Sequence, residues 1–180
     1  MKIKYLILLI FSLFLLSGCP TSDSSIKKDG KKKIPPKIYR LDLDADRVKE
    51  IVKIEDRFEE KQDFWVEFFL PLEKKEISFV MPGRFTDLEF IELNENGPKQ
   101  MAIYYEDKDR LSNLVIFELR NNRLVKIFAA IGCCGIETDF SSVLARIKVG
   151  KSPSGSKDCF WGDASHWEVW VWQGEKFIHY

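Results

Sequence analysis

Oxygen-bearing groups alternate along one short stretch of the chain, and together they could bind a hard cation. The candidate ligands are the carboxylates of Asp42, Asp44, Asp46 and Glu50 and the main-chain carbonyl of Val48. Calcium takes several oxygens at roughly 2.3–2.6 Å, often from alternate positions of a tight loop. Without a cation or solvent between them, four carboxylates this close would repel one another. The stretch therefore predicts either a calcium site or a metal-free turn in which aspartates accept main-chain N–H groups.

Two later stretches can be aligned with this one, and their ligand sets become poorer. An offset of 50 aligns residues 91–102 with residues 41–52 without a gap, and a further offset of 52 reaches the third stretch. The ligand positions hold Glu92, Asn94, Asn96 and Gln100 in the second stretch, and Leu144, Arg146, Lys148 and Ser152 in the third. One carboxylate makes a poor calcium site, and two cations exclude one. Only the first stretch is a candidate metal site.

Three cysteines in the folded part, Cys133, Cys134 and Cys159, could form a disulfide. Disulfides persist outside the cytoplasm, and the expected bond joins Cys159 to one of the two neighbours, leaving an odd thiol. A reactive redox pair is the alternative. It is disfavoured because adjacent cysteines lack the C-x-x-C spacing that tunes thiol acidity.

Two features near the C-terminus could suggest catalysis or binding. Asp163, Ser165 and His166 suggest a hydrolase, but the members of a triad converge from separate elements and no G-x-S-x-G frame surrounds Ser165. We therefore expect a polar loop there.

The tryptophans Trp167, Trp170 and Trp172 form the second feature. In a strand, alternation places Trp170 and Trp172 on one face and Trp167 on the other. One face should pack in the core. An exposed set could stack on a glycan or bind a hydrophobic protein partner.

The elements that must position these residues are predicted to be β-strands. Three hairpin-like segments have an alternating apolar strand, a short polar turn and a second strand, at 65–80, 114–129 and 167–180. Their turns are centred on residues 73–75, Asn121-Asn122 and Gln173-Gly174. Of the whole chain, only residues 47–62 have a composition that could pass for a helix, and 56–62 could form a helical turn.

The hairpins and the aligned stretches together form a repeat of about 50 residues. Each repeat reads as strand, loop, strand, strand, turn, strand, which is the unit of a β-propeller blade. We predict an all-β fold with three repeats of about four antiparallel strands, at about 38–83, 84–135 and 136–180. Three blades are too few to close a propeller, since four to eight are usual. The chain is therefore either a compact three-unit assembly or one subunit of an oligomer.

The acidic loops resemble the D-x-[DN]-x-D-G-x-x-[DE] signature of FG-GAP and VCBS-type repeats, which occur in integrin-like propellers and many secreted bacterial proteins. The resemblance covers 38–180 loosely and the first two loops closely, and it implies calcium at the first loop. The family's glycine is kept as Gly97 in the second loop but replaced by Arg47 in the first. Arginine resists the left-handed angle that glycine adopts.

The N-terminus resembles the leader of a bacterial lipoprotein. Lys2 and Lys4 precede an apolar run at 5–16, which at 12 residues is shorter than the roughly 20 that span a bilayer. Leu16-Ser17-Gly18-Cys19 then resembles a lipobox. The resemblance implies a signal peptide at 1–18, cleavage after Gly18 and a diacylglycerol thioether at Cys19. Two or three acyl chains give stable anchoring, whereas one does not.

Charge divides the rest of the chain into a basic tether and an acidic body. Residues 20–37 hold six lysines and two aspartates, and they are too poor in large apolar side chains to fold. The whole chain has a formal net charge of zero and the leader holds two lysines, so residues 38–180 carry about −6. An acidic body argues against a nucleic-acid partner. We expect a lipid-anchored protein of the bacterial cell envelope with a non-catalytic binding or structural domain; the alternative is a thiol-based or hydrolytic extracytoplasmic enzyme.

Overall fold

The computed structural model describes residues 35–95, 97–141, 144–152 and 166–180. Every described residue belongs to one compact unit, Ile34–Tyr180. The predicted signal peptide, Cys19 and most of the predicted tether lie outside the described residues. Among the described residues, no helix is both long enough and apolar enough to cross a membrane.

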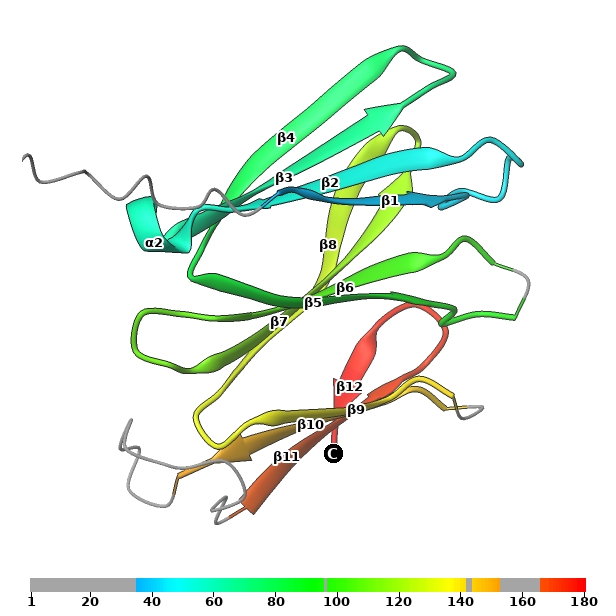
Figure 1. Cartoon of the computed structure of the whole chain (residues 1–180). Helices are drawn as coiled ribbons and strands as arrows, with labels where there is room; N and C mark the ends of the chain where they lie inside the picture. Colours follow the sequence, from blue (N-terminus) through cyan, green and yellow to red (C-terminus); the bar gives the residue numbers. More distant parts are fainter. Residues whose placement is uncertain (1–34, 96, 142–143, 153–165) are drawn as a thin grey trace, which may run out of the picture. The chain divides into compact units, whose positions relative to one another are not determined.

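Consecutive strands of the described chain form three four-stranded sheets, and every neighbouring pair is antiparallel (Figure 1). The first sheet holds β1 (Lys37–Leu41), β2 (Glu50–Asp56), β3 (Asp63–Leu70) and β4 (Lys75–Pro82). The second holds β5 (Arg84–Ile91), β6 (Gln100–Glu106), β7 (Ser112–Arg120) and β8 (Arg123–Gly132). The third holds β9 (Ile136–Asp139), β10 (Arg146–Lys151), β11 (His166–Trp172) and β12 (Phe177–His179). The predicted all-β fold of three four-stranded repeats is confirmed, and in the described residues the three sheets form neither a closed barrel nor a closed propeller.

The local sequence explains the hairpins within these sheets. Asn121 and Asn122 have φ angles of 50° and 58° and form a two-residue turn between β7 and β8. Asparagine tolerates positive φ, and such turns match the twist of the flanking strands. Between β3 and β4, Leu70 pairs with Lys75, so the turn occupies 71–74 and begins slightly earlier than predicted. The helical turn expected within 56–62 is observed as α2 (Phe58–Lys61).

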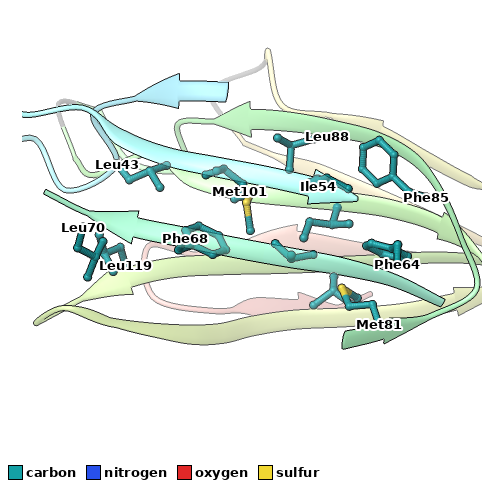
Figure 2. Close-up of a cluster of buried hydrophobic side chains, with 14 residues drawn as sticks. Leu43, Ile54, Phe64, Phe68, Leu70, Met81, Phe85, Leu88, Met101 and Leu119 are labelled. Atoms are coloured by element: carbon teal, nitrogen blue, oxygen red, sulfur yellow. The ribbon is translucent and has the colours of Figure 1, made fainter. Parts of the chain in front are cut away.

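Two cores hold the three sheets together. The first lies between the first and second sheets, where Phe64, Phe68 and Leu70 pack with Met101 and other residues of the second sheet (Figure 2). The second lies between the second and third sheets and contains Ile116, Phe128, Ile147 and Trp172, among others. The second sheet therefore buries both faces, which agrees with the nearly continuous apolar sequence of β6 and β7.

Side chains of the first strands make contacts between neighbouring sheets. The Tyr39 ring of β1 lies 5.9 Å from the Phe90 ring of β5. The Tyr104 hydroxyl of β6 lies 2.9 Å from Thr138 Oγ1 of β9. These contacts bring the first strands of the second and third sheets close together, which positions the groove described below.

A single glycine joins the first sheet to the second. Gly83 has a φ of 105°, and a Cβ at this position would lie 2.1 Å from the main-chain oxygen of Glu106. Only glycine fits both the angle and the close approach. Gly135, with a φ of 104°, precedes β9 in the same way, 52 residues later. The predicted offset of 52 thus holds at the start of the third repeat.

Candidate functional site

The first acidic loop, residues 42–49, brings together three of the five predicted cation ligands. It connects β1 to β2, whose last pair is Leu41 with Glu50. One carboxylate oxygen each from Asp42, Asp44 and Glu50 lie within 4.8 Å of one another. Asp42 Oδ1 is buried and has no hydrogen-bond partner among the described residues. These three carboxylates form the candidate metal centre.

The fourth predicted carboxylate, that of Asp46, is not part of this group. Asp46 Oδ1 accepts the Val48 N–H at 2.7 Å, and Asp42 Oδ2 accepts the Arg47 N–H at 2.9 Å. These bonds are those of a metal-free aspartate turn, in which the loop satisfies its own donors. Arg47 adopts a φ of 73°, so it takes the left-handed angle that the resembling family assigns to glycine.

Glu50 closes the first loop from its far end. The side chain is 3% exposed, and Glu50 Oε2 accepts the Leu43 N–H at 2.7 Å. Burial raises the pKa of Glu50, and the negative charges of Asp44 and Asp46 add to the increase. Burial likewise raises the pKa of Asp44, and Asp46 and Asp42 contribute repulsion. The loop therefore holds carboxylates in an environment that opposes their ionisation.

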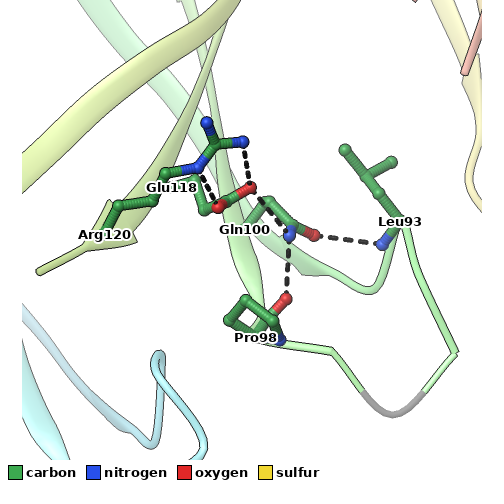
Figure 3. A network of polar contacts seen from close by, with 5 residues as sticks. All are labelled: Leu93, Pro98, Gln100, Glu118 and Arg120. Atoms are coloured by element: carbon green, nitrogen blue, oxygen red, sulfur yellow. Dashed lines mark hydrogen bonds and ion pairs between the residues drawn. The ribbon is translucent and has the colours of Figure 1, made fainter. Parts of the chain in front are cut away.

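The second loop uses the same construction with an amide in place of the carboxylate. Gln100 is fully buried and its Oε1 accepts the Leu93 N–H at 3.0 Å, while Nε2 donates to the Pro98 carbonyl at 2.8 Å. Nε2 also lies 3.4 Å from Glu118 Oε2, and Glu118 forms an ion pair with Arg120. Figure 3 shows this network connecting β7 to the loop. The predicted ligands Glu92 and Asn94 take other partners: Glu92 forms an ion pair with Lys99 at 3.0 Å, and Asn94 accepts the Trp172 indole N–H at 3.0 Å.

The prediction is wrong where it places Arg146 and Lys148 at loop positions of the third repeat, whereas Leu144 and Ser152 do lie outside the strands. Arg146 and Lys148 lie in β10, where they pair with Asp139 and Glu137. Asp87 pairs with a residue 17 positions later, whereas Asp139, its counterpart at an offset of 52, pairs with one only 7 positions later. The β9–β10 hairpin is therefore ten residues shorter than the β5–β6 hairpin, and it has no counterpart of the acidic loop.

A groove between the second and third sheets is a concave feature that the sequence did not predict. Two adjoining hollows of about 390 Å³ and about 450 Å³ share Glu89 and Thr138 in their walls, and we call them together the β5–β9 groove. Five carboxylates line it, and all five residues are exposed: Asp87, Glu89, Glu92, Glu106 and Asp139. The cationic side chain in its lining is Lys99, which pairs with Glu92. The groove therefore has an acidic rim.

Tyr104 fixes the position of the two sheets at the centre of this groove. Its hydroxyl donates to Glu89 Oε2 at 2.9 Å, so Thr138 Oγ1, also at 2.9 Å, must donate to it. Burial raises the pKa of Tyr104, and the charges of Glu89 and Asp87 add to the increase. The hydroxyl is thus a neutral donor that holds Glu89 at the rim. The alternation of Asp87 and Glu89 along β5 was the available sequence signal for one acidic face, but nothing in the sequence showed that the third sheet would lie opposite.

The cysteines lie at the connection between the second and third sheets. Cys134 is fully buried and disulfide-bonded, and Cys133 is a free thiol whose Sγ lies 3.6 Å from Cys134 Sγ. Cys133 Sγ accepts the Ser152 N–H at 3.0 Å. Pairing with Cys159 stays a prediction, because Cys159 lies outside the described residues.

The three tryptophans on β11 separate as strand alternation predicts. Trp172 is buried, and Trp170 packs edge-on against Phe128 with ring centroids 5.5 Å apart, so both belong to the second core. Trp167 is half-buried on the opposite face. Two of the three residues predicted as a binding surface are thus core residues. Of the polar triplet, His166 begins β11 and is exposed, while Asp163 and Ser165 lie outside the described residues.

Comparison with known proteins gives little further information. No protein-family model matches the chain, and no curated protein sequence matches it. Among solved structures, the chain is similar to PliI-Ah, a periplasmic lysozyme inhibitor of I-type lysozyme from Aeromonas hydrophyla, with 14% sequence identity and a TM-score of 0.40. The match covers 55% of this chain and 90% of that one. A likeness at this level is too weak to show a shared fold or a shared partner.

The first loop should tolerate an amide in place of its buried carboxylate. We expect Glu50→Gln to be at least as stable as the wild type at pH 7, because Gln100 already makes the equivalent bond and the change removes a buried charge. Glu50→Ala should instead lower the free energy of unfolding by roughly 1–3 kcal/mol, since the buried Leu43 N–H loses its acceptor. Urea denaturation of the three proteins measures both effects.

The same variants predict a pH dependence. The folded-state pKa of Glu50 is raised above its usual value of 4.5, so its contribution to stability is complete below that value and is lost as pH rises through the raised pKa. The wild type should therefore lose stability relative to Glu50→Gln between acid and neutral pH. A parallel pH profile for the two proteins would contradict this.

Proposed function

We propose that the chain is a non-catalytic, lipid-anchored binding protein of the bacterial cell envelope, and that the β5–β9 groove binds an extended cationic segment of a protein partner. The observation that carries the proposal is the groove itself, which combines a concave shape with five exposed carboxylates. The described residues supply the binding surface, whereas the anchor rests on the sequence of the leader.

Electrostatics favour a cationic partner. The lining carboxylates lie near one another, and the folded part carries about −6 overall, so its field attracts a basic segment before contact. The apolar surface of Ile136 and Phe140 in the groove walls gives the aliphatic stems of lysine or arginine a place to pack.

Main-chain hydrogen bonding supports an extended ligand. Both β5 and β9 are edge strands of their sheets. An edge strand presents main-chain N–H and C=O groups that an added strand can pair with. Side-chain charge would then select a basic sequence, and main-chain bonds would hold it regardless of its exact residues.

The lipid anchor would place this domain on the extracytoplasmic side of the membrane. The resemblance of Leu16-Ser17-Gly18-Cys19 to a lipobox supports lipidation of Cys19. A signal peptide at 1–18 and a basic tether at 19–37 complete the proposed organisation. If it behaves as a flexible chain, as its composition predicts, a tether of eighteen residues would have a root-mean-square reach of about 20–25 Å. That reach would let the groove meet partners near the membrane surface.

We also propose that the first acidic loop binds calcium, as its resemblance to FG-GAP and VCBS-type loops implies. Three carboxylates converge there, and Asp42 Oδ1 lacks a hydrogen-bond partner among the described residues. Asp42, Asp44 and Glu50 would supply the protein oxygens, and solvent would complete the shell because calcium takes six to eight ligands. The ion would offset the charge repulsion that, after burial, adds to the raised pKa values of Asp44 and Glu50.

The anchor is tested by replacing the lipidated residue. Cys19→Ala should move the protein from the membrane fraction to the soluble or secreted fraction, because no acyl chain can be attached. Fractionation followed by metabolic labelling with a palmitate analogue measures this. Cys133→Ala, which removes the free thiol, serves as the control and should keep both label and membrane partition. Unchanged membrane association of Cys19→Ala would show that the anchor assignment is wrong.

The groove is tested with a defined probe, a ten-residue peptide of alternating lysine and alanine. Glu89→Lys and Glu106→Lys should each weaken its binding by about threefold to tenfold, since exposed charge pairs contribute up to about 1 kcal/mol and reversal adds repulsion. Fluorescence anisotropy at low salt measures the affinity. Glu73→Lys reverses an equally exposed charge on the β3–β4 turn and should change affinity by less than about twofold. Equal losses of affinity in all three variants would mean that only the net charge of the protein matters, and would exclude the groove as the binding site.

Calcium binding is tested by thermal unfolding. Excess calcium should raise Tm of the wild type, because a ligand at one hundred times its Kd adds about 2.7 kcal/mol to stability. Asp44→Asn should abolish the shift while keeping an acceptor for the Asp46 N–H. Glu92→Gln, a matched change in the second loop, should leave the shift intact. A wild type whose Tm ignores calcium would identify the loop as a metal-free turn.

A further inference from the structure

The contacts between sheets follow one rule along the third strand of each repeat. In the first contact, alternate residues of β3 (Phe64, Val66, Phe68) share a core with alternate residues of β7 (Val115, Phe117, Leu119). In the second contact, the other row of β7 (Leu114, Ile116) shares a core with Trp170 and Trp172 of β11. β7 therefore uses one row of side chains toward the preceding sheet and the other row toward the following sheet, whereas β3 and β11 each use one row.

This rule leaves two rows without a partner sheet in the described chain. On β3 the row is Trp65, Glu67 and Phe69, and on β11 it is Trp167, Val169 and Val171. By position, the β3 row is the one that would face a preceding sheet, and the β11 row is the one that would face a following sheet.

Both rows belong to faces that remain partly apolar. On the first sheet, Phe69 is 40% exposed, and Val80, which pairs with Trp65, is 51% exposed. On the third sheet, Trp167, Val169 and Val171 are half-buried, and so is Ile178, which pairs with Val171. Large apolar side chains clustered on one face of a sheet are typical of a contact surface.

We propose that two copies of the chain associate through these faces, with the β11 row of one copy packed against the β3 row of the other. The contact would continue the stacking that the chain already uses twice. Two such contacts are related by a two-fold axis and close a ring of six sheets, which is within the range of four to eight that closes a propeller. This inference does not depend on the proposed groove or its ligand.

The charges on the two faces are compatible with this pairing. On the first sheet, Lys53 forms an ion pair with Glu67 at 2.5 Å, and Glu55 and Glu76 also lie close enough to favour its charged form. On the third sheet, Arg146 and Lys148 pair with Val171 and Val169 along β10 and β11. Arg146 and Lys148 also pair with Asp139 and Glu137 of β9, so a face with an excess of carboxylates would meet a face whose two cations lie beside two carboxylates. A buried carboxylate in such a row has a precedent, because Glu118 of β7 is 7% exposed and paired with Arg120.

Site-directed cross-linking of the full-length chain in detergent tests the pairing of the two rows. Glu67→Cys and Val169→Cys place one thiol at the centre of each row, and the two variants are co-expressed with different tags. A short bis-maleimide should join the differently tagged chains, whereas either variant alone should give no more dimer than the wild type, whose Cys133 provides the background. Efficient cross-linking of Glu67→Cys to itself would instead mean that the first sheets meet each other, and would overturn the proposal.

Mass measurement by light scattering provides an independent readout. The wild type should have the mass of a dimer, and Phe69→Lys should raise the dimer dissociation constant at least tenfold with an unchanged circular dichroism spectrum. Ile131→Lys alters a residue on β8 that is 54% exposed and lies outside both rows, so it should leave the dimer intact. A monomeric wild type at micromolar concentration would refute the ring.

Discussion

The structure depends on the second sheet, which must be covered on both faces. Neighbouring residues of β6 belong to different cores: Ile103 packs toward the first sheet and Ala102 toward the third. A sheet of this kind cannot leave either face in water, because each exposed apolar face forfeits roughly 25 cal/mol for every Å². The first and third sheets therefore form around the second, each burying one face against it. Their outer faces carry a weaker alternation, with ion pairs such as Lys53–Glu67 among the apolar residues.

Buried polar side chains define the loops that the sheets leave at their ends. Glu50 and Gln100 occupy the first position of β2 and β6, and each accepts an N–H from the residue seven positions earlier. A buried N–H without an acceptor would cost roughly 1–3 kcal/mol, so these side chains are structural before they are anything else. In the first repeat Glu50 therefore closes the acidic loop, and its carboxylate also lies near those of Asp42 and Asp44. In the second repeat Gln100 makes the same hydrogen bond although the loop has lost most of its carboxylates. The structural role of this position is therefore independent of metal binding.

The sequence predicted those parts of the fold that local chemistry determines. Alternating strands, the Asn121-Asn122 turn and the separation of Trp167 from Trp170 and Trp172 each follow from the two-residue period or from tolerance of positive φ. The third loop was misassigned because the offset of 52, which holds at Gly135, was carried through a hairpin that is ten residues shorter. A single sequence marks where a repeat begins, but it does not reveal that the hairpin inside this repeat is shorter than its counterparts.

The groove could not be predicted for a different reason. Its walls come from β5, β6 and β9, so it exists only because Tyr104 and Thr138 bring two sheets together. Asp87 and Glu89 read in sequence as ordinary solvent-facing residues of an edge strand, where charges also prevent unwanted pairing. Whether Asp87 and Glu89 line a groove or only protect an edge strand depends on which strand lies opposite them. The stacking of the sheets determines this, and the sequence of β5 does not.

The opposite charges of residues 20–37 and of the body would act in opposite senses near an anionic membrane. The six lysines of 20–37 would be attracted to anionic head groups, whereas the body at about −6 would be repelled by them. Both forces act over a Debye length of about 8 Å at physiological salt. An anionic surface would therefore attract the lysines of 20–37 and repel the body. It would also attract a cationic segment, so charge alone does not make the groove selective, and its shape and main-chain hydrogen bonds must supply the remainder.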